Sequence, residues 1–99
     1  MTKSKAYQEY LIERLRDPRE AKEYLNAALE EEDPELFLLA LRNVAEAQGG
    51  IAKLAEKTKL NRESLYKMLS KHGNPTLETL QEILKPLGLR VSVALDEAA

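Results

Sequence analysis

The sequence predicts a mostly α-helical protein of one domain, and three observations lead to this prediction. Apolar residues recur every three or four positions over most of the 99 residues, as on one face of an α-helix. Pairs that end or begin helices, such as Asp17-Pro18 and Gly49-Gly50, divide these stretches into segments of helix length. The alternation typical of a strand occurs only near the C-terminus.

Three helices are expected in the first half of the chain. The first covers about residues 4–16, and the second begins at Asp17-Pro18, because Asp is a favoured N-cap and Pro is tolerated at the first helical position. Asp33-Pro34 repeats this start and opens a third helix that reaches about residue 48. This third helix has a wide apolar face, as expected of a central core helix.

Three shorter helices are expected in the second half. Gly49-Gly50 ends the third helix, a fourth follows over about residues 51–58, and a fifth over about 62–71 has Asn61 as its N-cap. Thr76 caps a sixth helix, which should stop near Lys85 because Pro86 lacks the backbone N–H that a helix needs.

A short strand is expected at residues 89–95, where apolar and other residues alternate. A lone strand has unpaired backbone groups, so we expect it to pair with the same strand of a second copy and form a homodimer. The alternative is an irregular apolar tail packed on the core, and residues 96–99 should be loose. The residues that would face the dimer are Leu89, Val91, Val93 and Leu95.

The composition argues against several classes of protein. The absence of cysteine excludes disulfides and thiolate metal sites, and one histidine, His72, cannot build a zinc site without partners. No Gly-rich phosphate loop or nucleophile motif is present, so we expect neither an enzyme nor a metal or cofactor. The lack of an apolar run of about 18 residues and of a signal peptide predicts a soluble, cytoplasmic protein.

The charges are unevenly distributed along the chain, although the net charge is only -2. Residues 1–48 carry 7 basic and 11 acidic side chains, whereas residues 49–90 carry 8 basic and 4 acidic ones. This asymmetry indicates that the two segments face different partners.

Residues 51–71 have the spacing of a helix-turn-helix. Two short helices separated by only three or four residues must cross steeply, and Ala55 provides a small residue at the crossing. Leu54, Leu60, Leu65 and Met68 would hold the second helix against the first. The polar residues of the second helix then project outward.

The projecting side chains suit a DNA major groove. Arg62 can bind guanine through two hydrogen bonds, Lys67 adds a second cation, Glu63 can accept from cytosine, and Tyr66 can contact a phosphate or a thymine methyl. The surrounding cations suit phosphate oxygens and are Lys53, Lys57, Lys59 and Lys71. The alternative is an ordinary helical pair with a solvated lysine face.

A set of motifs in order along the chain resembles the Xre-type addiction-module antidote proteins, the HigA-like antitoxins. The motifs are residues 25–37 (LNAALEEEDPELF), 49–51 (GGI), 62–70 (RESLYKMLS), 73–80 (GNPTLETL) and 87–91 (LGLRV). Together they extend the resemblance over roughly residues 17–93.

The resemblance implies a phage-repressor-like helical bundle, a dimer that represses its own operator, and a RelE/ParE-type toxin that the protein neutralises. It places the base-reading positions on Arg62, Glu63, Tyr66 and Lys67, and backbone contacts on Asn61 and on the turn at Asn74. One departure is Lys59, which stands where the family usually has Gly and would need a left-handed conformation at a cost of about 1 kcal/mol.

The acidic first half is the expected contact region for the toxin. Its acidic cluster contains Glu30, Glu31 and Glu32. Tyr7, Tyr10 and Leu11 would supply apolar anchors if the first helix is not packed on its own domain. The alternative is a solvated surface whose charges only favour helix starts.

These observations predict an antitoxin in which residues 1–33 meet the toxin, residues 34–88 form the DNA-binding core, and residues 89–95 form the dimer. The paired half-sites on double-stranded operator DNA should lie about one turn apart, roughly 34 Å. Two alternatives remain: a stand-alone Xre-type repressor without a toxin, and a helical protein-interaction adaptor that never binds DNA.

Overall fold

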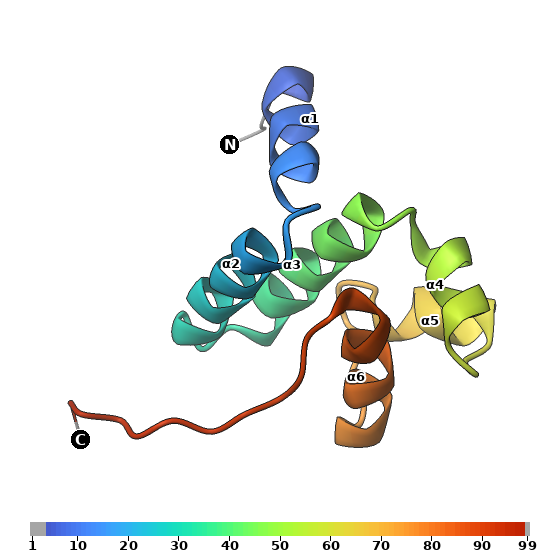
Figure 1. The fold of residues 1–99 in the computed structure, drawn as a ribbon. Coiled ribbons are helices and arrows are strands. Elements are labelled where there is room, and N and C mark those ends of the chain that lie inside the picture. Colours follow the sequence, from blue (N-terminus) through green and yellow to red (C-terminus); the bar gives the residue numbers. More distant parts are fainter. Residues whose placement is uncertain (1–3, 99) are drawn as a thin grey trace.

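A computed structural model describes residues 4–98, and these residues form six α-helices and one short 3-10 helix (Figure 1). The prediction of a mostly helical chain is therefore confirmed. In chain order the elements are α1 (Lys5–Arg14), α2 (Pro18–Glu30), α3 (Pro34–Ala47), α4 (Ile51–Lys57), α5 (Arg62–Met68), α6 (Leu77–Leu84) and the 3-10 helix η1 (Lys85–Leu87).

Side-chain caps set the helix starts where the sequence predicted them. The carboxylate of Asp17 accepts a hydrogen bond from the Arg19 N–H at 2.9 Å, and that of Asp33 accepts one from the Glu35 N–H at 3.0 Å. Each Asp is followed by a proline in the first turn, which needs no hydrogen bond there. The hydroxyl of Thr76 caps α6 in the same way.

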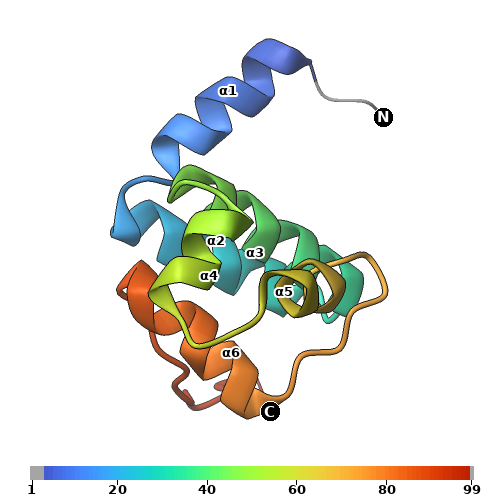
Figure 2. The same ribbon diagram turned by 90° about the vertical axis from the view of Figure 1, so that its right-hand side faces the viewer.

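The core lies around α3, which packs beside α2 and also contacts α1 and α4 (Figures 1 and 2). Leu41 and Val44 of α3 are fully buried, as are Leu65 of α5 and Ile83 of α6. Buried residues of α1 and α2 belong to the same hydrophobic cluster as those of the later helices. The two segments divided at residue 33 therefore share one core.

Helix α1 projects from the body of the molecule in both views (Figures 1 and 2). Leu11, together with Leu15 just after the helix end, anchors it in the core. A side-chain hydrogen bond of 3.1 Å from Gln8 Nε2 to Asn43 Oδ1 links it to α3. Asn43 is buried, and its Nδ2 donates in turn to the Tyr24 hydroxyl of α2 at 2.9 Å.

The chain leaves the last helix as the proline predicts. Helix α6 ends at Leu84, Pro86 lies in the 3-10 turn that follows, and Gly88 adopts a left-handed conformation with φ of 77°. Glycine adopts this conformation without steric cost, so it terminates the helical segment.

The expected strand at residues 89–95 is not formed by the single chain, and the prediction differs from the structure here. Residues 89–95 have no ladder with any other part of residues 4–98, because no second strand is available. Leu89 packs against the core, whereas Val93 and Leu95 are 96% and 91% exposed. Pairing across a dimer remains a prediction.

None of the helices within residues 4–98 combines the length and apolarity that a membrane crossing requires.

Candidate nucleic-acid interface

Helices α4 and α5 are joined by a four-residue turn that is held by side-chain hydrogen bonds. Thr58 ends α4 in an extended conformation, and its hydroxyl accepts from the Leu60 N–H at 3.2 Å. Asn61 then caps α5, because its Oδ1 accepts from the N–H groups of Glu63 and Ser64 at 2.8 and 3.2 Å. The predicted N-cap at Asn61 is confirmed.

The prediction that Lys59 adopts a left-handed conformation is wrong. Within residues 4–98, Glu32 is the only residue other than glycine with a positive φ, at 55°. The extended Thr58 redirects the chain after α4, so Lys59 needs no strained conformation. The positive φ of Glu32 was not predicted and belongs to the turn between α2 and α3.

The inner face of α5 is held in the core. Leu65 and, just after the helix, Leu69 are fully buried. The Arg42 side chain of α3 donates to the Leu69 carbonyl, which fixes the C-terminal end of α5 against α3. No sequence signal distinguished Arg42 from an ordinary surface arginine, so sequence analysis missed this contact.

The outer face of α5 brings together the four residues predicted to read bases. Arg62, Glu63, Tyr66 and Lys67 are all exposed, and positions four apart are neighbours on a helix surface. The Arg62 guanidinium carbon lies 5.8 Å from the centre of the Tyr66 ring, a cation–π contact. The spacing of these two residues by four positions could have predicted this contact.

The predicted phosphate-binding cations lie on α4, in the turn before α5 and just after α5, and their side chains are exposed. In the part of the chain that the structure describes, none of them takes part in an ion pair. These cations are the exposed residues Lys53, Lys57, Lys59 and Lys71. Exposed, unpaired cations suit contacts with an anionic partner such as a phosphate backbone.

The turn that follows α5 is closely packed. A Cβ atom on Gly73 would collide with the backbone carbonyl of Met68, so glycine is required at this position. His72 Nδ1 lies 3.5 Å from Glu35 Oε1 at the start of α3, and Asn74 is exposed beside it. His72 is therefore a surface residue paired with a carboxylate.

The residues predicted to meet a toxin are only partly on the surface. Tyr7 and Tyr10 are exposed on α1, but Leu11 is 9% exposed and belongs to the core, so it is not the exposed anchor that the sequence predicted. The reason is that α1 packs on α3 at this point. Glu30, Glu31 and Glu32 are exposed at the end of α2.

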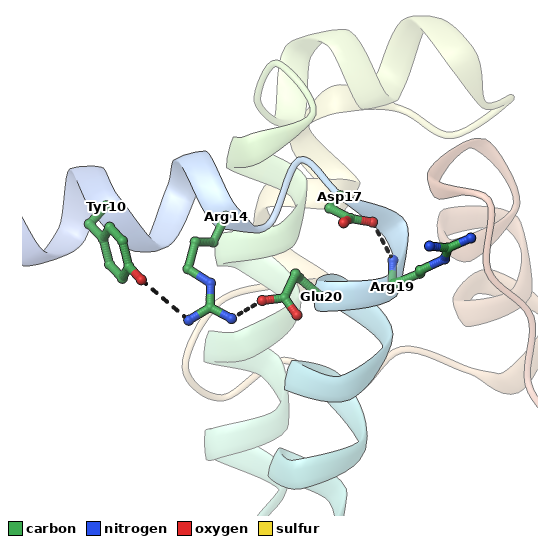
Figure 3. A network of polar contacts seen from close by, with 5 residues as sticks. All are labelled: Tyr10, Arg14, Asp17, Arg19 and Glu20. Atoms are coloured by element: carbon green, nitrogen blue, oxygen red, sulfur yellow. Dashed lines mark hydrogen bonds and ion pairs between the residues drawn. The ribbon is translucent and has the colours of Figure 1, made fainter.

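Arg14 connects α1 to α2 beside these tyrosines (Figure 3). Its guanidinium forms an ion pair with Glu20 and lies 3.5 Å from the Tyr10 hydroxyl, to which it donates. Figure 3 also shows the neighbouring cap, in which Asp17 accepts from the Arg19 N–H. The network joins α1 to the first turns of α2.

Residues 4–98 contain no cluster of three or more His, Asp or Glu side chains suited to a metal ion. The site described above is thus a surface of cations and hydrogen-bonding groups on α5 and its flanks.

Comparison with known proteins identifies the family of the chain. Residues 6–95 match the model of a family described as "Probable addiction module antidote protein". A Haemophilus influenzae protein, named only "Uncharacterized protein", is 40% identical over 83 residues, which are 84% of this chain and 84% of that protein. No solved structure matches the chain. With a family model that extends over nearly all of its helices, the chain belongs to the addiction-module antidote proteins, the antitoxins that act on a cognate toxin.

Proposed function

We propose that this antidote also represses its own operon in the cytoplasm by placing α5 in the major groove of double-stranded DNA. The observation that carries the proposal is the open face of α5, on which Arg62, Glu63, Tyr66 and Lys67 project while Leu65 is fully buried behind them. Arginine and glutamate side chains match the donor and acceptor pattern of base edges in that groove.

The flanking lysines supply affinity without sequence information. Lys53, Lys57, Lys59 and Lys71 are exposed and carry no ion pair within residues 4–98. Their contacts with phosphates release counterions, so operator binding weakens steeply with salt.

The repressor acts as a homodimer formed through residues 89–95. Val91, Val93 and Leu95 are exposed in the single chain, and their backbone lacks a ladder partner in residues 4–98. Pairing with a second copy buries these side chains and completes the backbone hydrogen bonds of the strand. The resulting two-fold dimer contacts two half-sites about one DNA turn apart.

The toxin, which the family resemblance implies to be of the RelE/ParE type, binds the first third of the chain. This location is supported by the exposed Tyr7 and Tyr10, by the exposed acidic residues Glu30 to Glu32, and by the excess of acidic side chains in the first half of the chain. Family membership favours this role over a stand-alone repressor without a toxin.

The experiment for DNA binding compares two arginine variants on a duplex of the protein's own promoter. Arg62→Ala removes a base-reading group and should weaken binding by about 1–3 kcal/mol and relax specificity at one base pair. Arg19→Ala removes the same charge from the start of α2 and should bind like the wild type. Promoter binding that is unchanged by Arg62→Ala and by the salt concentration would contradict the proposal and favour a helical adaptor.

A further inference from the structure

The strongest unassigned feature is a groove between α1 and the pair formed by α2 and α3. It encloses about 390 Å³. Its apolar lining includes Ala27 of α2 and Leu36 and Leu39 of α3, whose side chains are 37% and 44% exposed. We call it the α2 groove. Exposed apolar side chains gathered around a concave surface are typical of binding sites.

A second cavity of about 300 Å³ continues the α2 groove toward the start of α2. Leu11 and Tyr24 line both cavities. The second cavity adds Tyr7 and Tyr10 of α1 to the lining. The two cavities thus follow one face of α2 from Glu20 to Glu31, long enough for about three turns of a helix.

The rim formed by the α2 groove and the cavity that continues it is acidic. Glu20, Glu23 and Glu31 line the two cavities, and Arg14 is the only cation among the lining residues. That cation is already engaged by Glu20 and Tyr10 (Figure 3). An occupant with cationic side chains beside its apolar ones is therefore complementary to the groove.

The α2 groove is built before any partner arrives. The buried Asn43 accepts from Gln8 of α1 and donates to Tyr24 of α2, so one side chain connects the three helices that form its walls. Preorganisation of this kind lowers the entropic cost of binding.

We propose that the α2 groove seats an amphipathic helix of the cognate toxin, with apolar residues on Leu36 and Leu39 and Lys or Arg near Glu31. This proposal rests on the toxin contact of the first third of the chain and specifies its surface. A helix is the fitting occupant because helices form the walls, and none of the lining residues belongs to a strand whose edge could accept an added strand.

The test measures the affinity of the full chain for the toxin encoded by the neighbouring reading frame. Leu36→Lys and Leu39→Lys should each weaken the complex at least 10-fold. The matched control is Leu77→Lys on α6, where the leucine is 61% exposed and lies outside both cavities. This control should stay within about threefold of the wild type. Because all three leucines are exposed, unfolding temperatures should remain unchanged.

A pair of glutamates tests the charge of the rim. Glu31 lines the groove, whereas the adjacent and equally charged Glu30 does not. At 0.15 M salt, where screening acts over about 8 Å, Glu31→Lys should weaken the complex and Glu30→Lys should change it little.

Three outcomes separate the groove from the broader proposal. Loss of affinity in Leu36→Lys and Leu39→Lys, with affinity kept in the control Leu77→Lys, supports the α2 groove as the binding site. A wild-type complex that the groove variants leave intact, or that only Leu29→Lys on the other side of α2 disrupts, overturns the α2 groove and leaves the toxin contact standing. Absence of any wild-type complex overturns the proposed toxin contact as well.

Discussion

Gly73 shows how a single atom limits the sequence near the proposed DNA-reading helix. Its backbone passes so close to the Met68 carbonyl that a methyl group has no space. Gly73→Ala should therefore lower the free energy of unfolding by about 1–3 kcal/mol, as overpacking does elsewhere. Chemical denaturation measures this difference.

The neighbouring Asn74 provides the control for Gly73. It lies in the same turn and is exposed, so Asn74→Ala should change the free energy of unfolding by less than about 0.5 kcal/mol. Equal stability of Gly73→Ala and the wild type would contradict the close packing of this turn.

Local chemistry explains which residues could be predicted from the sequence. Asp17, Asp33 and Asn61 act as caps because their side chains bond to N–H groups two or three residues away. Lys59 and Leu11 were predicted incorrectly because their states depend on other elements. The extended Thr58 makes the turn for Lys59, and the packing of α1 on α3 buries Leu11.

Substitutions of Asn61 separate its role as the cap of α5 from the proposed binding of α5 to DNA. Asn61→Ala removes the acceptor for two N–H groups and should cost about 0.5–2 kcal/mol of stability. Asn61→Asp keeps a favoured cap and adds a negative charge, so it should retain stability and weaken operator binding. Thermal unfolding and fluorescence anisotropy distinguish the two effects.

The opposite pattern would contradict this account of α5. If Asn61→Asp bound the promoter as tightly as the wild type, the start of α5 would not face phosphates. If Asn61→Ala were as stable as the wild type, the cap would contribute nothing.

Elements that form from local signals were predicted well, whereas the strand at residues 89–95 is absent from the single chain and its pairing across a dimer stays a prediction. Starts of α2, α3, α5 and α6 follow their caps, and α6 ends before Pro86 as expected. The strand at residues 89–95 depends on a second strand for its hydrogen bonds, so alternation alone could not establish it. On α5, helical periodicity identified the exposed face correctly.

Residues 89–95 lead us to expect a homodimer in solution. Val93 is 96% exposed in the single chain. Val93→Lys places a charge in the proposed dimer interface and should yield monomers by light scattering, whereas Ser92→Lys, at the adjacent position on the opposite face of an extended strand, should leave dimers. An unchanged dimer mass for Val93→Lys would exclude this interface.

The net charge of -2 conceals two surfaces of opposite sign. The cations lie on and around α4 and α5, and three acidic residues, Glu20, Glu23 and Glu31, line the α2 groove and the cavity that continues it. Helix α1, whose residues line both cavities, projects from the body (Figures 1 and 2). Separate surfaces allow one antidote to bind two partners of different chemistry. We therefore expect DNA and toxin to bind different faces of the molecule.

Backbone amide chemical shifts of the isotope-labelled chain locate the two binding faces. Adding a duplex of its own promoter should shift the amide signals of residues 53–74 and leave those of α1 unchanged. Adding the toxin should shift the amide signals of α1, of α2 and of the first turns of α3. Promoter-induced shifts centred on α1 and α2, or toxin-induced shifts centred on α5, would contradict this expectation.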